Sequence, residues 1–198
     1  MSVKAILFDF GGVLADEGFK HGLHAIARAN GLDPLAFESL AENLIYSTGY
    51  LTGQASEADF WHAIRRATGI RAEDAVLKRM ILERFTLRPW MIDTVRGLKG
   101  RLQLAILSDQ TNVLDELDAG LHFFDLFDHV FNSYHLGKSK RDPSIFDDVQ
   151  AVMGIAPKMA LFIDDRPGNV ARADSRGLMT ILYTGRDEFL KELAAVLA

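Results

Sequence analysis

The sequence of 198 residues contains no cysteine. Disulfides, thiolate zinc sites and cysteine nucleophiles are therefore excluded, which is compatible with a reducing compartment. No apolar run approaches the roughly 20 residues that a helix needs to span a bilayer. The N-terminal stretch KAILFDFGGVLA resembles a signal peptide, but Asp9 interrupts it where a secretory hydrophobic region would be continuous. We therefore expect a cytoplasmic protein with no membrane association.

An excess of positive charge is also missing. The chain has 22 Lys and Arg against 27 Asp and Glu, giving a formal net charge of −5. This balance argues against a general nucleic-acid or anionic-membrane binder, although it leaves room for a local cationic pocket that binds a small anion. With 48% hydrophobic residues, the chain is long enough for one good core and a small subdomain.

Five short apolar runs predict buried strands. They lie at about 3–8, 102–107, 128–131, 160–163 and 178–182. The runs are continuously apolar rather than alternating, which is typical of parallel strands covered on both faces. Helix-like stretches near 111–119, 143–153 and 167–176 separate the last four runs, and another lies near 186–197. This alternation predicts an α/β fold with a doubly wound parallel sheet.

Residues 17–85 interrupt the alternation with helical periodicity and no convincing strand. Ser56, with Glu57 and Asp59 shortly after it, indicates a capped helix start. We therefore predict a helical insertion after the first strand. The expected organisation is an α/β core formed by residues 1–16 and 86–198, with a helical cap subdomain over residues 17–85.

Polar side chains follow three of the predicted strands. Asp9 follows the first strand, Ser108 and Asp109 the second, and Asp164 and Asp165 the fourth. Each alone could be a turn residue or a helix N-cap. If these strands are neighbours, however, the side chains converge at the carboxyl edge of the sheet, where α/β proteins bind ligands. Adjacent carboxylates repel one another unless a cation compensates, and oxygen ligands without cysteine favour Mg²⁺.

Four stretches, in this order, resemble the four motifs of the haloacid dehalogenase-like hydrolase superfamily. They are ILFDFGGVL, AILSD, GKSKRDPSIF and LFIDDRPGNVARADSRGL. The resemblance implies a nucleophile at Asp9, a hydroxyl donor at Ser108 and the family's lysine at Lys140. It also implies that the helical insertion is a small cap. Within the superfamily, DFGGVL and SDQTN look closest to glucose-1-phosphate phosphatases and to the phosphatase domain of soluble epoxide hydrolases.

The activity implied by this resemblance is Mg²⁺-dependent hydrolysis of a small phosphorylated metabolite, such as a sugar phosphate, through an aspartyl-phosphate intermediate. The residues expected to contact the metal are Asp9, Gly11 through its backbone carbonyl, Asp164 and Asp165. The residues expected to bind the substrate are Gly11, Ser108, Asp109 and Lys140.

Gly11 departs from the family pattern. Most phosphatases of the superfamily have a second aspartate at this position, which protonates the leaving group. General acid catalysis contributes roughly 10²–10⁴-fold, so the chain is expected to prefer good leaving groups such as sugar 1-phosphates or acyl phosphates. Alternatively it uses another donor, for which Asp16 and His24 are candidates.

Two other functions remain open. A metal-independent 2-haloacid dehalogenase would use the same nucleophile, although the Asp164–Asp165 pair speaks against it. A non-catalytic phosphate-binding or regulatory protein is motivated by Gly11. Arg141 replaces the family's usual proline and is expected only to loosen its loop. Candidates for the cap surface that meets the substrate are Tyr46, Tyr50, Trp61 and His62.

Overall fold

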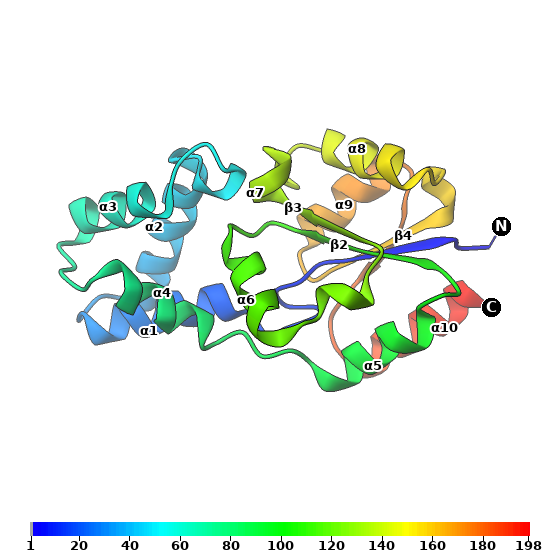
Figure 1. Cartoon of the computed structure of the whole chain (residues 1–198), viewed down its shortest axis with the longest axis horizontal. Coiled ribbons are helices and arrows are strands. Elements are labelled where there is room, and N and C mark those ends of the chain that lie inside the picture. Colours follow the sequence, from blue (N-terminus) through cyan, green and yellow to red (C-terminus); the bar gives the residue numbers. More distant parts are fainter. Residues whose placement is uncertain (1) are drawn as a thin grey trace.

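The computed structural model describes residues 2–198. Its centre is a five-stranded sheet in which every neighbouring pair is parallel, in the order β3-β2-β1-β4-β5 (Figure 1). The strands are β1 (Ala5–Phe8), β2 (Gln103–Ser108), β3 (His129–Asn132), β4 (Ala160–Asp164) and β5 (Met179–Leu182). All five predicted strands are present, and the predicted doubly wound parallel sheet is confirmed.

Strand β1 lies in the middle of the sheet, between β2 and β4. Phe8 is paired with Ile106 of β2 and with Ile163 of β4. The next residues, Asp9 and Asp164, therefore stand level with each other at the carboxyl edge, and Ser108 ends β2 beside them. This register brings together side chains that are far apart in the sequence.

Helices cover both faces of the sheet. Ile6 and Phe8 of β1 join a hydrophobic cluster that includes α5, α6 and α10, whereas Ala5 and Leu7 face a second cluster that includes α8 and α9. The core helices are α5 (Pro89–Leu98), α6 (Val113–Leu121), α7 (Ser133–Leu136), α8 (Ser144–Met153), α9 (Pro167–Ser175) and α10 (Arg186–Leu197). Short 3₁₀ turns are η2 (Phe124–Leu126) and η3 (Pro157–Met159). The sequence pattern did not predict α5 and α7.

The chain between β1 and α5 is helical, as predicted. It contains α1 (Gly18–Ala29), α2 (Pro34–Ser47), η1 (Tyr50–Thr52), α3 (Glu57–Thr68) and α4 (Asp74–Leu82). These helices lie at the end of the molecule opposite the two termini (Figure 1). Helix α3 begins with the predicted cap: the Ser56 Oγ accepts a hydrogen bond from the Asp59 backbone N–H at 3.2 Å, and the Asp59 carboxylate accepts one in return from the Ser56 backbone.

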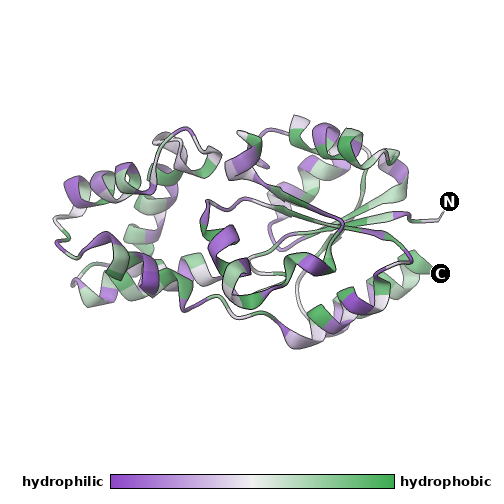
Figure 2. Cartoon of the chain, viewed as in Figure 1, coloured by the Kyte–Doolittle hydropathy of each residue, from purple (hydrophilic) through white to green (hydrophobic). Residues whose placement is uncertain are grey.

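Hydrophobic and hydrophilic residues alternate along the helices of both parts, as expected for helices that bury one face (Figure 2). Over residues 2–198, no helix combines the length and apolar composition that crossing a membrane requires.

Candidate active site

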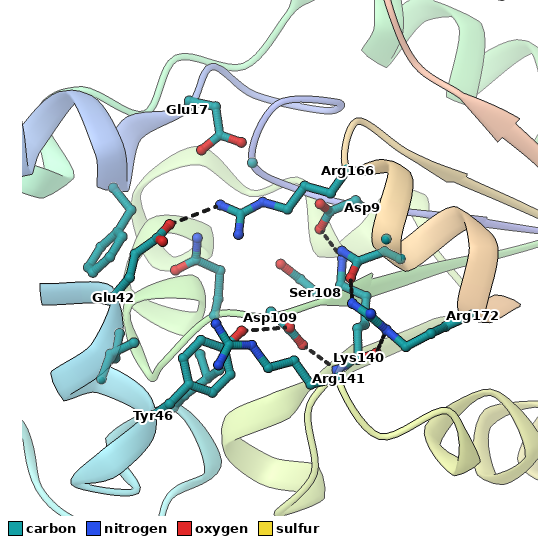
Figure 3. A pocket seen from close by; sticks show the side chains of 17 residues that line it. Asp9, Glu17, Glu42, Tyr46, Ser108, Asp109, Lys140, Arg141, Arg166 and Arg172 are labelled. Atoms are coloured by element: carbon teal, nitrogen blue, oxygen red, sulfur yellow. Dashed lines mark hydrogen bonds and ion pairs between the residues drawn. The ribbon is translucent and has the colours of Figure 1, made fainter. Parts of the chain in front are cut away.

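A pocket of about 270 Å³ lies at the carboxyl edge of the sheet, between the core and the inserted helices (Figure 3). The core contributes Asp9, Gly11, Ser108, Asp109, Gln110, Lys140, Arg141, Arg166, Gly168, Asn169 and Arg172. The segment between β1 and α5 contributes Glu17, Phe19, Glu42, Ile45, Tyr46 and Leu51. Nearly all predicted site residues therefore meet in one place. Asp164 adjoins this pocket through its contacts with Lys140, Asn169 and the Arg166 backbone, and Asp165 adjoins it beside Glu17.

Lys140 is the central cation of the site. Its Nζ lies 2.9 Å from Asp9 Oδ1 and 2.6 Å from Asp164 Oδ2, and the side chain is 1% exposed. Burial alone would favour neutral lysine, but the carboxylates of Asp164 and Asp9 outweigh it and raise the pKa of Lys140. The lysine is therefore charged, and it ties the end of β1 to the end of β4.

Asp9 is buried directly after the end of β1. Its Oδ1 accepts a hydrogen bond from the Phe10 backbone N–H at 2.7 Å. Burial raises the pKa of Asp9 well above its ordinary value; the charge of Lys140 opposes this shift, while Asp164 and Asp165 reinforce it. A carboxylate nucleophile must be ionised, and a further cation beside Asp9 would favour that form.

Three carboxylates gather at the carboxyl edge of the sheet. One carboxylate oxygen from each of Asp9, Asp164 and Asp165 lies within 4.8 Å of the other two. Asp164 is held by the Arg166 backbone N–H at 2.8 Å and by the Asn169 side-chain amide at 3.0 and 3.1 Å. Asp165 differs, because its Oδ1 is buried without a hydrogen-bond partner. An orphaned carboxylate oxygen in an acidic cluster is what a bound cation would satisfy.

Two further features fit a cation at this cluster. Burial and the neighbouring Glu17 carboxylate raise the pKa of Asp165 to about 7. Gly12 has φ +87°, and a Cβ there would lie 2.3 Å from Asp165 Oδ2, so only glycine leaves room for this carboxylate. The donor set is oxygen only, which suits Mg²⁺.

Asp109 lines the pocket, but its carboxylate is already engaged. Its Oδ1 accepts hydrogen bonds from the Ser133 hydroxyl at 2.6 Å and the Lys140 backbone N–H at 2.8 Å. Its Oδ2 accepts one from the Tyr46 hydroxyl at 3.3 Å. Asp109 thus holds the Lys140 loop and a helix of the insertion, which the sequence did not predict. Its expected contact with the substrate stays a prediction.

The space beside Gly11 is open enough for a side chain. A Cβ there would lie 3.7 Å from the Gln110 Nε2 and 3.9 Å from a ring carbon of Phe85, which are ordinary contacts. The two candidate proton donors from the sequence are elsewhere. Asp16 faces Arg88 at 3.5 Å, the His24 Nε2 lies 2.5 Å from Glu38, and neither lines the pocket. A donor role for either residue stays a prediction that the pocket lining does not support.

Of the four cap residues proposed from the sequence, only Tyr46 lines the pocket. Tyr50 and Trp61 are 3% and 2% exposed and pack around Phe60, while His62 is exposed outside the pocket. Sequence analysis missed Glu17, Glu42, Arg166 and Arg172. The position of Arg166 directly after the acidic pair was a usable signal, whereas the helical pattern around Glu42 gave none.

Comparison with known proteins places the chain in a family. Residues 3–173 match the family described as haloacid dehalogenase-like hydrolase. The chain is 24% identical over 216 residues to D-ribitol-5-phosphate phosphatase of Bacteroides thetaiotaomicron, and the match covers 98% of each protein. It is also 25% identical over 206 residues to a drimenol cyclase of Aspergillus calidoustus; that match covers 98% of this chain but only 36% of the longer relative.

Solved structures share the fold. A haloacid dehalogenase-like family hydrolase from Porphyromonas gingivalis has a TM-score of 0.81 and 25% identity, with 100% of this chain and 98% of that chain covered. A family enzyme from B. thetaiotaomicron, solved with magnesium and inorganic phosphate, has a TM-score of 0.76 and 22% identity, with 94% and 97% covered. The sheet order, the helical insertion after β1 and the family match together show that this chain belongs to the haloacid dehalogenase-like hydrolases.

Proposed function

We propose that this hydrolase is a Mg²⁺-dependent phosphatase that acts on a small phosphorylated metabolite through an aspartyl-phosphate intermediate on Asp9. The observation that carries the proposal is the position of Lys140, which bridges Asp9 and Asp164 beside an acidic cluster with an orphaned oxygen. The activity named for the full-length D-ribitol-5-phosphate phosphatase relative supports a phosphoric monoester as the substrate.

The residues of the pocket match the needs of phosphoryl transfer. A phosphoryl group repels an approaching carboxylate, so its oxygens must be neutralised and held. The Lys140 ammonium and the Ser108 hydroxyl are the proposed donors to these oxygens. Asp9, Asp164, Asp165 and the Gly11 carbonyl would hold Mg²⁺, which supplies additional positive charge at the phosphoryl group when bound.

The proposed reaction has two displacements at phosphorus. An Asp9 carboxylate oxygen attacks the phosphorus atom, and the bond from phosphorus to the leaving-group oxygen breaks. Water then attacks the phosphorus atom of the aspartyl-phosphate. The bond between phosphorus and Asp9 breaks, so that inorganic phosphate is released and the carboxylate is restored.

The described pocket has no carboxylic acid at the position where most phosphatases of the superfamily protonate the leaving group. No carboxylic acid is present at position 11, and Asp16 and His24 lie outside the pocket. The polar side-chain atom nearest to a Cβ at Gly11 is the Gln110 Nε2, which can donate a hydrogen bond but not a proton at neutral pH. The proposal therefore includes a preference for leaving groups that depart without protonation. The motif likeness to glucose-1-phosphate phosphatases fits such substrates and stays a prediction.

The proposal also assigns residues 17–85 to a cap that covers the substrate and excludes water. Glu42 and Tyr46, both in α2, line the pocket and support this assignment. The cytoplasmic location predicted from the sequence is kept as part of the proposal.

A phosphate-release panel tests the function. The panel compares sugar phosphates, alkyl phosphates and acyl phosphates with Mg²⁺ and with EDTA, using the parent and the Asp9→Asn variant. We expect release that requires Mg²⁺ and is lost in Asp9→Asn. Asp16→Asn is the matched control, because Asp16 faces Arg88 outside the pocket, and it should keep the activity. Halide release without metal would favour a dehalogenase, and ligand binding without any turnover would favour a non-catalytic protein.

A further inference from the structure

The guanidinium group of Arg141 lies against the ring of Tyr46. Its central carbon is 3.4 Å from the ring centroid, so the two planar groups are stacked. Arg141 belongs to the core loop between α7 and α8, and Tyr46 belongs to α2 of the inserted helices. From the sequence, we expected the replacement of the family's usual proline by Arg141 only to loosen the loop. The structure shows that it also brings a positive charge into the pocket.

The loop and the ring that position Arg141 are both fixed. The backbone of the preceding residue, Lys140, donates its N–H to Asp109 at 2.8 Å, and its carbonyl accepts a hydrogen bond from the Arg172 Nε at 2.7 Å. The Tyr46 hydroxyl donates to Asp109 Oδ2 at 3.3 Å. Burial and the Asp109 charge raise the pKa of Tyr46 to about 12, so the phenol stays neutral. The guanidinium is thus held in place before any ligand arrives.

Arg141 differs from the other cations of the pocket in having no polar partner. Lys140 pairs with Asp9 and Asp164, Arg166 faces Glu42 at 3.7 Å, and Arg172 donates to Asn169 and to the Lys140 carbonyl. Over residues 2–198, no carboxylate or carbonyl accepts a hydrogen bond from the Arg141 guanidinium. Because Tyr46 covers one face of the group, the N–H donors at its edge remain available, in the fork geometry that matches a carboxylate or a phosphate.

The direction of Arg141 places it where the substrate's second end would lie. In Figure 3 the guanidinium groups of Arg141 and Arg166 both reach toward the inserted helix that carries Glu42 and Tyr46. Lys140, Ser108 and Arg141 line the same pocket, so a substrate whose phosphoryl group is held by Lys140 and Ser108 can extend into the part of the pocket that Arg141 lines. Arg141 is an exposed residue at the pocket, so its N–H donors can reach a ligand there, and an anionic tail would pair with them whereas a neutral tail would not.

We propose that Arg141, stacked on Tyr46, binds a second anionic group of the substrate, either a carboxylate or a second phosphate. The inference rests on the proposed phosphatase function and narrows its substrate class. Arg141 is then a residue that determines specificity rather than one that takes part in phosphoryl transfer. The preferred substrates are short phosphomonoesters that carry a negative charge at the end opposite the scissile phosphate.

Matched substrate pairs test this inference. α-D-Glucose 1-phosphate and α-D-glucuronic acid 1-phosphate share a sugar ring and an anomeric phosphate, whose leaving group is less basic than an alkoxide, and they differ by one carboxylate. α-D-Glucose 1,6-bisphosphate, compared with glucose 1-phosphate, provides the same comparison for a second phosphate. We measure kcat/KM with Mg²⁺ for all three and expect at least one anionic compound to be preferred over glucose 1-phosphate. The pair with the larger ratio identifies the kind of anion.

Substitutions then test whether Arg141 and Tyr46 cause the preference for the anionic substrate. Arg141→Met keeps the length of the side chain but removes its charge, and should lower the anionic-to-neutral ratio by about 10- to 100-fold, mainly through KM. Arg141→Lys keeps the charge without the planar fork and should restore only part of the ratio. Tyr46→Phe retains the stacking ring and should retain more of the ratio than Tyr46→Leu. Arg71→Met removes an exposed arginine outside the pocket and should leave the ratio as in the parent.

The outcomes separate this inference from the proposed function. If glucose 1-phosphate is hydrolysed as well as both anionic sugar phosphates, or if Arg141→Met leaves the ratio unchanged, the second-anion site is overturned and the phosphatase stands. The same conclusion follows if members of the broader panel are hydrolysed and neither anionic sugar phosphate is. If neither these three compounds nor any member of the broader panel releases phosphate with Mg²⁺, the proposed function fails and the inference fails with it. The melting temperature of each variant, compared with the parent, shows whether a lost ratio reflects a lost fold.

Discussion

The ammonium nitrogen of Lys140 lies 2.9 Å from Asp9 Oδ1, at a position where the lysine side chain is 1% exposed. The same nitrogen lies 2.6 Å from Asp164 Oδ2, whose side chain is fully buried. One buried cation therefore compensates two buried carboxylates that come from adjacent strands. Lys140, Asp9 and Asp164 form the proposed reaction centre. Because their charges neutralise one another in a buried position, they also determine the stability of the fold.

Replacing Lys140 by methionine should therefore destabilise the protein strongly. The change keeps the volume but leaves Asp9 and Asp164 without their partner, and breaking a buried ion pair costs about 3–5 kcal/mol. The loss should be largest at pH 8 and smaller near pH 5, because burial raises the pKa of Asp9 and the unpaired Asp9 carboxyl can then take up a proton. Urea denaturation of the metal-free protein at both pH values measures the effect.

The matched control is Lys138→Met in the same loop. Lys138 pairs with Asp148 at the surface, where ion pairs contribute little, so its loss should change the urea midpoint only slightly. Equal midpoints for Lys140→Met and the parent would contradict the compensation described above.

Much of this centre could be predicted from the sequence. The apolar runs end at Asp9, Ser108 and Asp164, and the carboxyl ends of parallel strands meet at one edge of a sheet. The insertion was also predictable, because helical periodicity replaces strand-like runs between β1 and β2. Helix α5 was missed although Pro89 marks a helix start and Met91, Ile92, Val95 and Leu98 follow with helical spacing.

The rest of the pocket depends on how the inserted helices sit on the core. Nothing in the local pattern of α2 distinguishes Glu42 or Tyr46 from any other partly buried helix residue. The stacking of Arg141 on Tyr46 joins side chains 95 positions apart and exists only once the two parts are packed. Sequence reasoning could identify the unusual residues, such as Gly11 and Arg141, but not the neighbours that give them a role.

Magnesium affinity should depend on pH through Asp165. Burial and Glu17 raise the pKa of this carboxyl to about 7, so protons compete with the metal below that value. The affinity should therefore rise with pH through about pH 7, where Asp165 loses its proton. Calorimetric titrations at several pH values, in buffers of different ionisation enthalpy, measure both the affinity and the proton released.

The same raised pKa affects stability with a defined sign. Since the folded protein binds this proton more tightly than the unfolded chain, the metal-free protein loses stability as the pH rises from about 4 to about 7. Asp165→Asn should reduce this loss and weaken Mg²⁺ binding, whereas Asp174→Asn, an exposed acid on α9, should do neither. A pH-independent Mg²⁺ affinity in the parent would refute the role given to Asp165.

Gly11→Asp should restore acid assistance to the leaving group. The site accepts a Cβ at ordinary contact distances, 3.7 Å from Gln110 and 3.9 Å from Phe85, so the variant is expected to fold. General acid catalysis contributes roughly 10²–10⁴-fold, and it matters most when the leaving group is basic. The rate with alkyl phosphates should therefore increase relative to aryl phosphates, and a plot of log kcat/KM against leaving-group pKa should become flatter.

Gly12→Asp is the contrasting variant for this experiment. It adds the same carboxyl group one residue later, but at φ +87° and with a Cβ that would lie 2.3 Å from Asp165 Oδ2. This variant should lose both Mg²⁺ binding and activity. The explanation of the leaving-group preference by Gly11 is wrong if the slope is the same in the parent and in Gly11→Asp.

Gly22→Ala should destabilise the inserted helices by disturbing the contact between α1 and α4. A Cβ at Gly22 would lie 2.6 Å from the Ile81 Cα, and backbone cannot move aside as a flexible side chain can. Overpacking of this kind costs about 1–3 kcal/mol. Gly97→Ala is the control: it lies in α5 with no heavy atom within 4 Å of the new Cβ, and helix propensity predicts a gain of about 0.5–1 kcal/mol. The melting temperatures of the two variants should therefore shift in opposite directions. A melting temperature for Gly22→Ala at or above that of the parent would show that α1 and α4 are not packed as closely as described.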